Sequence, residues 1–180
     1  MNRKETKILV ENWRNALEEK PSVENIFDII SKLEEISKQT GENVKILYSL
    51  DGDYGRVEYN VFDELVSGAI DFERVNSGNN MGDFIIFETF TTTSGYGPLL
   101  YEILVEKATE RGVCLMSDQE SVSDSAKSVW DKYFKREDID HKQIRGEDNS
   151  SLSKCYSKRG NLIILKKLRE SDLIDFVEED

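Results

Sequence analysis

The sequence predicts a single α/β domain in which helices flank a mixed central sheet. The chain has 180 residues, of which 38% are hydrophobic, enough for one core. Residues 84–90 are rich in aromatic and β-branched side chains, which is typical of a largely buried strand. Apolar residues then recur at helical spacing from Leu99 to Ala108, and a second apolar run follows at 113–116. A strand, a helix and a strand in this order favour a parallel crossover connection.

The turn that joins the first strand to the helix is suited to anion binding. Gly95 and Gly97 permit positive φ angles, and Pro98 fits the first turn of a helix. The N–H groups of Gly95, Tyr96 and Gly97 have no acceptor within the helix, and the helix dipole adds positive charge there. The sequence therefore predicts either a pyrophosphate site or a tight turn without a ligand.

The N-terminal residues form a unit of their own. Residues 5–19 suit an amphipathic helix that ends before Pro21. We therefore divide the chain into residues 1–20, either an appendage or a packed helix, and a domain of residues 21–180.

A second helix and a hairpin are predicted next. The helix has Ser22 as its N-cap candidate and ends at Thr40. Its expected core-facing residues are Ile26, Phe27, Ile29, Ile30, Leu33 and Ile36. Strands at 44–50 and 56–59 flank a polar turn at 51–55.

Residues 61–75 fit a helix or a strand pair, and 76–82 have turn chemistry. In the second half, Ser121 and Asp124 fit a capping box for a helix that begins at Val122.

The remaining segments complete the predicted domain. Residues 137–150 are expected to be an exposed loop, 152–158 a strand and 162–176 a closing helix. The acidic end of the chain is expected to fray.

Charge and composition limit the function classes. The net charge of −12 argues against non-specific binding of nucleic acid or anionic lipid. Basic side chains gather at 154–159 and 166–169, which leaves room for a small local site. Without a secretory pattern or a long apolar run, a soluble intracellular protein with no membrane partner is expected.

The sequence predicts no metal site. Cys114 is expected in the core, as is Cys155, and neither belongs to a Cys-x-x-Cys pair. His141 is the single histidine, so zinc or a Cys–His catalytic pair has little support. Asp51 and Asp53 are not followed by the other ligands of a calcium loop.

Ser117 and Asp118 follow the second core strand. The carboxyl ends of strands in α/β sheets are the usual side for ligand crevices. Both residues are therefore candidates for chemistry, with helix entry and turn hydrogen bonding as the alternative.

Two segments give the chain a resemblance to the GNAT acetyltransferase family. Residues 92–97, Thr-Thr-Ser-Gly-Tyr-Gly, resemble the family's Gln/Arg-x-x-Gly-x-Gly/Ala turn, which holds the pyrophosphate of acetyl-coenzyme A. Residues 123–130 resemble its Asn-x-x-Ala-x-x-x-Tyr helix and keep Ala126. The resemblance implies acetyl transfer to an amine of unknown identity. It implies cofactor binding by Thr92, Ser94, Gly95, Tyr96 and Gly97, and a reacting centre near Ser117, Asp118 or Tyr133.

Two positions depart from the family pattern. Thr92 replaces the usual Gln or Arg, and Trp130 stands where the family often has a tyrosine that protonates the departing thiolate. An indole N–H cannot supply that proton, so Tyr133 or Tyr96 would have to replace it, or the acyl site has been lost.

The chain also resembles uncharacterised proteins of tailed bacteriophages. The shared blocks are Gly-Tyr-Gly-Pro-Leu-Leu-Tyr at 95–101, Leu-Met-Ser-Asp at 115–118, the segment 121–130 and Leu-Ser-Lys-Cys-Tyr at 152–156. This resemblance implies a place in the host cytoplasm or the virion interior. Residues 17–19, Leu-Glu-Glu, resemble the Leu/Ile-x-Glu site at which packaged phage proteins lose a targeting peptide. The alternative function is then a catalytically inactive protein that is packaged in the head or binds a host factor.

Overall fold

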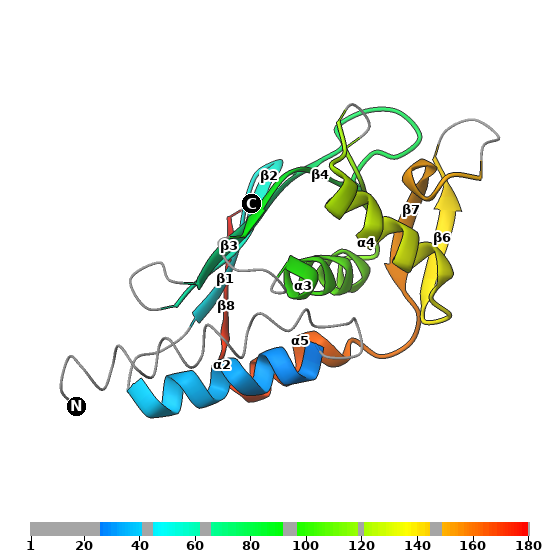
Figure 1. Ribbon diagram of the computed structural model, residues 1–180. Helices are drawn as coiled ribbons and strands as arrows, with labels where there is room; N and C mark the ends of the chain where they lie inside the picture. The colour runs from blue at the N-terminus through cyan, green and yellow to red at the C-terminus, as the bar shows by residue number, and fades with distance from the viewer. Residues whose placement is uncertain are drawn as a thin grey trace.

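The computed structural model describes residues 26–40, 45–61, 66–91, 97–118, 121–144 and 149–179. These segments form a single α/β domain, as predicted, with one mixed sheet of eight strands and four α-helices (Figure 1). The predicted N-terminal helix, the N-cap candidate Ser22 and the candidate cleavage site at 17–19 lie outside the described residues.

The sheet is antiparallel except at two places. The helices are α2 (Ile26–Thr40), α3 (Gly97–Glu110), α4 (Asp124–Lys135) and α5 (Ile163–Glu170), and a 3₁₀ turn spans Ser151–Ser153. The strands are β1 (Lys45–Asp51), β2 (Tyr54–Val61), β3 (Val66–Arg74), β4 (Phe84–Thr91), β5 (Leu115–Met116), β6 (Ile139–Gln143), β7 (Lys154–Lys158) and β8 (Ile174–Glu179). Their spatial order is β6-β7-β5-β4-β3-β2-β1-β8. Only β4 with β5 and β1 with β8 run parallel.

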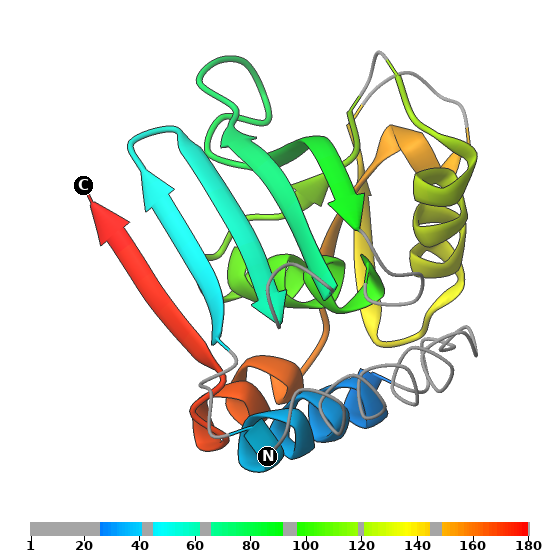
Figure 2. The same cartoon turned by 60° about the vertical axis from the view of Figure 1, so that its left-hand side comes forward.

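Helix α3 is the centre of the core. Every residue from Leu99 to Ala108 is buried, because the sheet covers one side of the helix while α2 and α5 pack against another. In Figure 2, β1 to β4 stand in front of α3, and α2 and α5 run side by side below it. The helix ends at Glu110, and Gly112 follows with a φ of 75°, which suits a glycine C-cap, as the sequence predicts.

Three charged side chains of α3 are buried, and each has partners from another element. Glu102 accepts hydrogen bonds from the guanidinium of Arg136, and Lys158 Nζ lies 3.5 Å from its carboxylate. Arg136 and Lys158 in turn share the carboxylate of Asp138, at 2.7 Å each. Since buried charges are tolerated only when paired, this network fixes the end of α4 and β7 against α3.

The other two buried charges connect α3 to the C-terminal segment. Glu106 accepts the backbone N–H groups of Ile164 and Leu165, at 3.2 and 2.8 Å, and so caps the start of α5. Lys107 Nζ lies 2.7 Å from Glu178 of β8, between the rings of Tyr48 and Phe176. Helix α3 therefore holds both α5 and β8 in place.

Two long-range strands were missed by the sequence prediction. Residues 137–150 are not simply a loop, because β6 pairs antiparallel with β7 at the sheet edge. The closing helix does not reach residue 176 and the end of the chain does not fray through 174–179. Helix α5 stops at Glu170, Asp172 has a φ of 52°, and β8 then pairs parallel with β1. Both strands are edge strands whose pairing depends on distant residues.

Three local predictions also need correction. The N-cap of α4 is Ser123, which accepts the N–H of Ala126, and not Ser121 of the predicted capping box. Phe27 is 43% exposed and does not face the core. Residues 87–91 of β4 are exposed, although a largely buried strand was predicted. Residues 66–74 form a strand, which decides the open choice at 61–75.

Most side chains of the basic clusters form ion pairs within the chain, and Lys154 donates a hydrogen bond to the Gln143 side chain. Arg159 pairs with Asp140, and Lys158 with Asp138. In α5, the basic side chains pair with carboxylates as well: Lys166 with Glu170, Lys167 with Glu34 and Arg169 with Glu110. These pairs leave little support for the small basic site considered from the sequence. None of the helices in the described segments has the length and apolarity that a membrane span requires.

We expect Arg136→Met to destabilise the protein by about 3–5 kcal/mol, because it leaves the Glu102 carboxylate, only 2% exposed, without its main partner. The matched control is Lys127→Met, which breaks the exposed pair with Asp131 on α4 and should cost less than about 1 kcal/mol. Urea unfolding of both variants measures the difference. Equal losses for the two variants would show that the Glu102 network does not hold α4 against α3.

Candidate functional site

The candidate site lies where the two parallel strands β4 and β5 separate. Their pairing is limited to Phe84 with Leu115 and Ile85 with Met116. β4 then continues beside β3 as far as Thr91, whereas β5 ends. A β-bulge occurs at the same point, because Phe87 is an extra residue in the register of β4 against β3. Beyond Ile85, the edge of β4 that faces away from β3 therefore has no strand beside it among the described residues.

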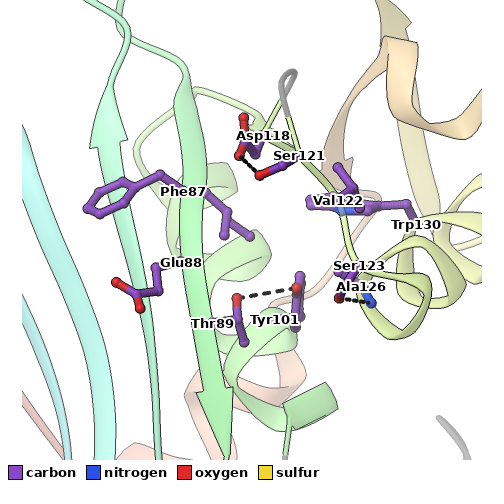
Figure 3. Close-up of a pocket in the computed structure, with 11 residues that line it drawn as sticks. Phe87, Glu88, Thr89, Tyr101, Asp118, Ser121, Val122, Ser123, Ala126 and Trp130 are labelled. Atoms are coloured by element: carbon purple, nitrogen blue, oxygen red, sulfur yellow. Dashed lines mark hydrogen bonds between the residues drawn. The ribbon is translucent and has the colours of Figure 1, made fainter.

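A cavity of about 690 Å³ fills this opening (Figure 3). Its walls come from β4, from α3, and from the segment that follows β5 and enters α4. The lining residues are Ile86, Phe87, Glu88, Thr89, Tyr101, Asp118, Ser121, Val122, Ser123, Ala126 and Trp130. The cavity is large enough for an elongated small-molecule ligand, and it has both apolar and polar walls.

Among the lining residues, Tyr101 is the one with a phenol side chain. Its hydroxyl lies 3.3 Å from the hydroxyl of Thr89, and its ring is buried. Burial raises the pKa of Tyr101, against the opposing effect of the Thr89 hydrogen bond, so the phenol is protonated at neutral pH. The sequence analysis did not single out Tyr101, although it ends the Gly-Tyr-Gly-Pro-Leu-Leu-Tyr block. In the predicted helix, Tyr101 lies between Leu100 and Ile103, which belong to the apolar residues at helical spacing.

The start of α3 lies next to the cavity. Gly97 is the first helical residue, one turn before Tyr101, and Thr91 lies two residues beyond Thr89 in β4. A Cβ at Gly97 would meet the Cγ2 of Thr91 at 3.8 Å, an ordinary contact. The fold itself therefore does not require glycine here. Helix N-termini in general attract anions, and this one begins one turn before the lining residue Tyr101.

Two carboxylates line the cavity. Asp118 accepts a hydrogen bond of 3.3 Å from the Ser121 hydroxyl, at the end opposite Thr89 and Tyr101 in Figure 3. Glu88 lies on β4, directly across from Asp71 of β3. The pKa of Asp71 is raised, first by burial and also by the charge of Glu88. In Figure 3 the Glu88 carboxylate points to the side of β4 away from Tyr101 and Asp118.

The structure brings only part of the predicted site together. Asp118 lines the cavity and Gly97 begins α3, whereas Thr92, Ser94, Gly95 and Tyr96 lie outside the described residues. Ser117 is buried, with its hydroxyl 3.4 Å from the carbonyl of Leu152, and is not a lining residue.

Tyr133 is also kept away from the cavity. Its ring is buried against Trp130 and Tyr156, at centroid distances of 5.9 and 6.0 Å, and it does not line the cavity. Burial holds the pKa of Tyr133 well above its usual value. Trp130 itself reaches the cavity wall and stacks on Tyr156. Tyr101 is therefore the aromatic lining residue that presents a hydroxyl group to the cavity.

Comparison of the chain with protein-family models, with curated proteins and with solved structures finds no match.

Proposed function

We propose that the protein binds an acyl-coenzyme A between β4 and β5 and transfers the acyl group to an amine. The observation that supports this proposal is the cavity at the point where these strands separate, with the start of α3 one turn before its lining residue Tyr101. The free edge of β4 offers backbone groups to an extended chain with amides, as in strand addition. The pyrophosphate then lies at the N-terminus of α3, where N–H groups and the helix dipole favour an anion.

The lining residues supply the proton transfers of such a reaction. The amine nitrogen attacks the thioester carbonyl, forming a C–N bond, and the C–S bond then breaks. Asp118 accepts the proton that the amine loses. The protonated phenol of Tyr101 gives its proton to the departing thiolate, a role that Trp130 cannot perform. Tyr101 thus takes the part for which Tyr133 or Tyr96 was considered from the sequence.

Isothermal titration with acetyl-coenzyme A tests the cofactor site. We expect the parent protein to bind, and Gly97→Glu to weaken binding at least about ten-fold, because its carboxylate repels the pyrophosphate. Gly97→Ala is the control, since its methyl group fits beside Thr91 and adds no charge. No binding by a folded parent protein would reject the proposal and favour the non-catalytic alternative.

A second pair of variants tests the position of the ligand. Ala126 lines the cavity, whereas Ser128 is an exposed residue of the same helix, α4. We expect Ala126→Trp to abolish the thermal stabilisation by acetyl-coenzyme A, because the indole fills ligand space, and Ser128→Trp to preserve it. If both variants are stabilised like the parent, the ligand lies elsewhere.

Kinetics test the role of Tyr101. With spermidine as a probe amine, release of the coenzyme A thiol should show a kcat lowered about 10²-fold or more in Tyr101→Phe, with little change in KM for acetyl-coenzyme A. Tyr133→Phe should keep the parent kcat. A Tyr101→Phe enzyme as active as the parent would remove the phenol from the mechanism without affecting the binding proposal.

A further inference from the structure

A second group of reactive side chains lies at the amino ends of β4 and β5. Cys114 precedes β5, Cys155 lies in the adjacent β7, and Asp83 precedes β4. The two sulfur atoms and a carboxylate oxygen of Asp83 all lie within 4.8 Å of one another. All three residues are buried. The cluster could not be recognised from the sequence, because its members are separated by about 30 and 40 residues.

The cysteines are joined by a disulfide, with their Cα atoms 5.5 Å apart. Their burial agrees with the sequence analysis, but their pairing was not expected. It follows from the adjacency of β5 and β7, which only the sheet topology shows. Disulfides persist in oxidising compartments and are reduced by dithiols elsewhere, so both the bonded and the dithiol form of this pair are accessible to the protein.

A separate cavity of about 360 Å³ opens onto the cluster. It is lined by Asp83, Cys114 and Cys155, and it shares no lining residue with the larger cavity. Asp83 is held in place because its Oδ1 accepts the Cys114 N–H at 3.0 Å. Its Oδ2 bonds Lys142 Nζ at 2.8 Å, but the Lys142 side chain is 56% exposed and is free to turn into solvent.

We propose that the reduced chain binds a divalent zinc-type ion through Cys114, Cys155 and Asp83. Reduction by a dithiol gives two thiols at the expense of one disulfide in the reductant. The ion then displaces two protons from the thiols and takes one oxygen of Asp83 in place of Lys142. Zinc accepts such thiolate and carboxylate ligands at about 2.0–2.3 Å, so a cluster of this size closes around it with small side-chain rotations. The cavity supplies room for a water as the fourth ligand.

The disulfide and the ion exclude each other, because a disulfide sulfur carries no thiolate charge to donate. The oxidised form of this cluster therefore cannot bind the ion. Cys114 is held by the disulfide in the oxidised form and by the ion in the reduced form. It lies four residues before Asp118, which lines the larger cavity.

Titration of the full chain with Co²⁺, a spectroscopic substitute for zinc, tests the proposal. We expect the reduced protein to bind one Co²⁺ per chain and to show a thiolate-to-cobalt charge-transfer band. The oxidised protein should show none. Asp83→Asn keeps an acceptor for the Cys114 N–H but lacks the charge, and should weaken binding at least about ten-fold. The control is Asp140→Asn, an exposed residue of the same cavity, which should bind like the parent.

Two results would overturn the proposal. One is a folded, reduced parent without the charge-transfer band. The other is a Cys155→Ser variant whose band and affinity equal those of the parent. Because Cys155→Ser alters the core, a second measurement uses the parent alone: Zn²⁺ should slow disulfide formation by diamide at least about ten-fold. An unchanged rate would also contradict metal binding at these sulfurs.

Discussion

The three buried charges of α3 are the constraint on which the rest of the structure depends. A charged group taken out of water is stable only with partners, and the partners of Glu102, Glu106 and Lys107 come from separate segments. Arg136 and Lys158 hold α4 and β7, Glu106 caps the N-terminus of α5, and Glu178 places β8 beside β1. One helix thereby fixes elements that are distant along the chain. Its apolar residues provide the burial, and its charges specify which segments surround it.

The candidate site is a consequence of this arrangement. Because α3 follows β4 along the chain, its first turn lies near the carboxyl end of β4, several residues beyond Ile85, where the pairing with β5 stops. Within the described segments, the bulge at Phe87 and the short β5 leave the edge of β4 without a neighbouring strand, and Ala126 and Trp130 of α4 line the cavity from the other side. The same helix supplies Tyr101, whose phenol lines the cavity one turn after the start of the helix.

Strand β5 lies between the two cavities, one lined by Asp118 and the other by Cys114. It has only two residues, so its position depends on what holds its ends. At the start, Cys114 is fixed to Cys155 and lies beside Asp83, and at the end the chain leads to Asp118. The chemistry at one end of β5 and the wall of the larger cavity are therefore joined by a short, buried piece of backbone.

The sequence by itself determined the elements that local patterns specify. Glycine and proline at 95–98, helical spacing from Leu99 to Ala108 and Gly112 predict α3 and its ends, and the neighbouring apolar runs predict β4 and β5. Asp118 was placed correctly because the carboxyl end of a strand is a local feature. In contrast, β6, β8, the disulfide, the position of Tyr101 at the cavity and the burial of Ser117 and Tyr133 appear only in the tertiary structure. Each of these depends on which distant segment lies alongside, and polar edge strands or an aromatic residue within a helix carry no local sign of their neighbours.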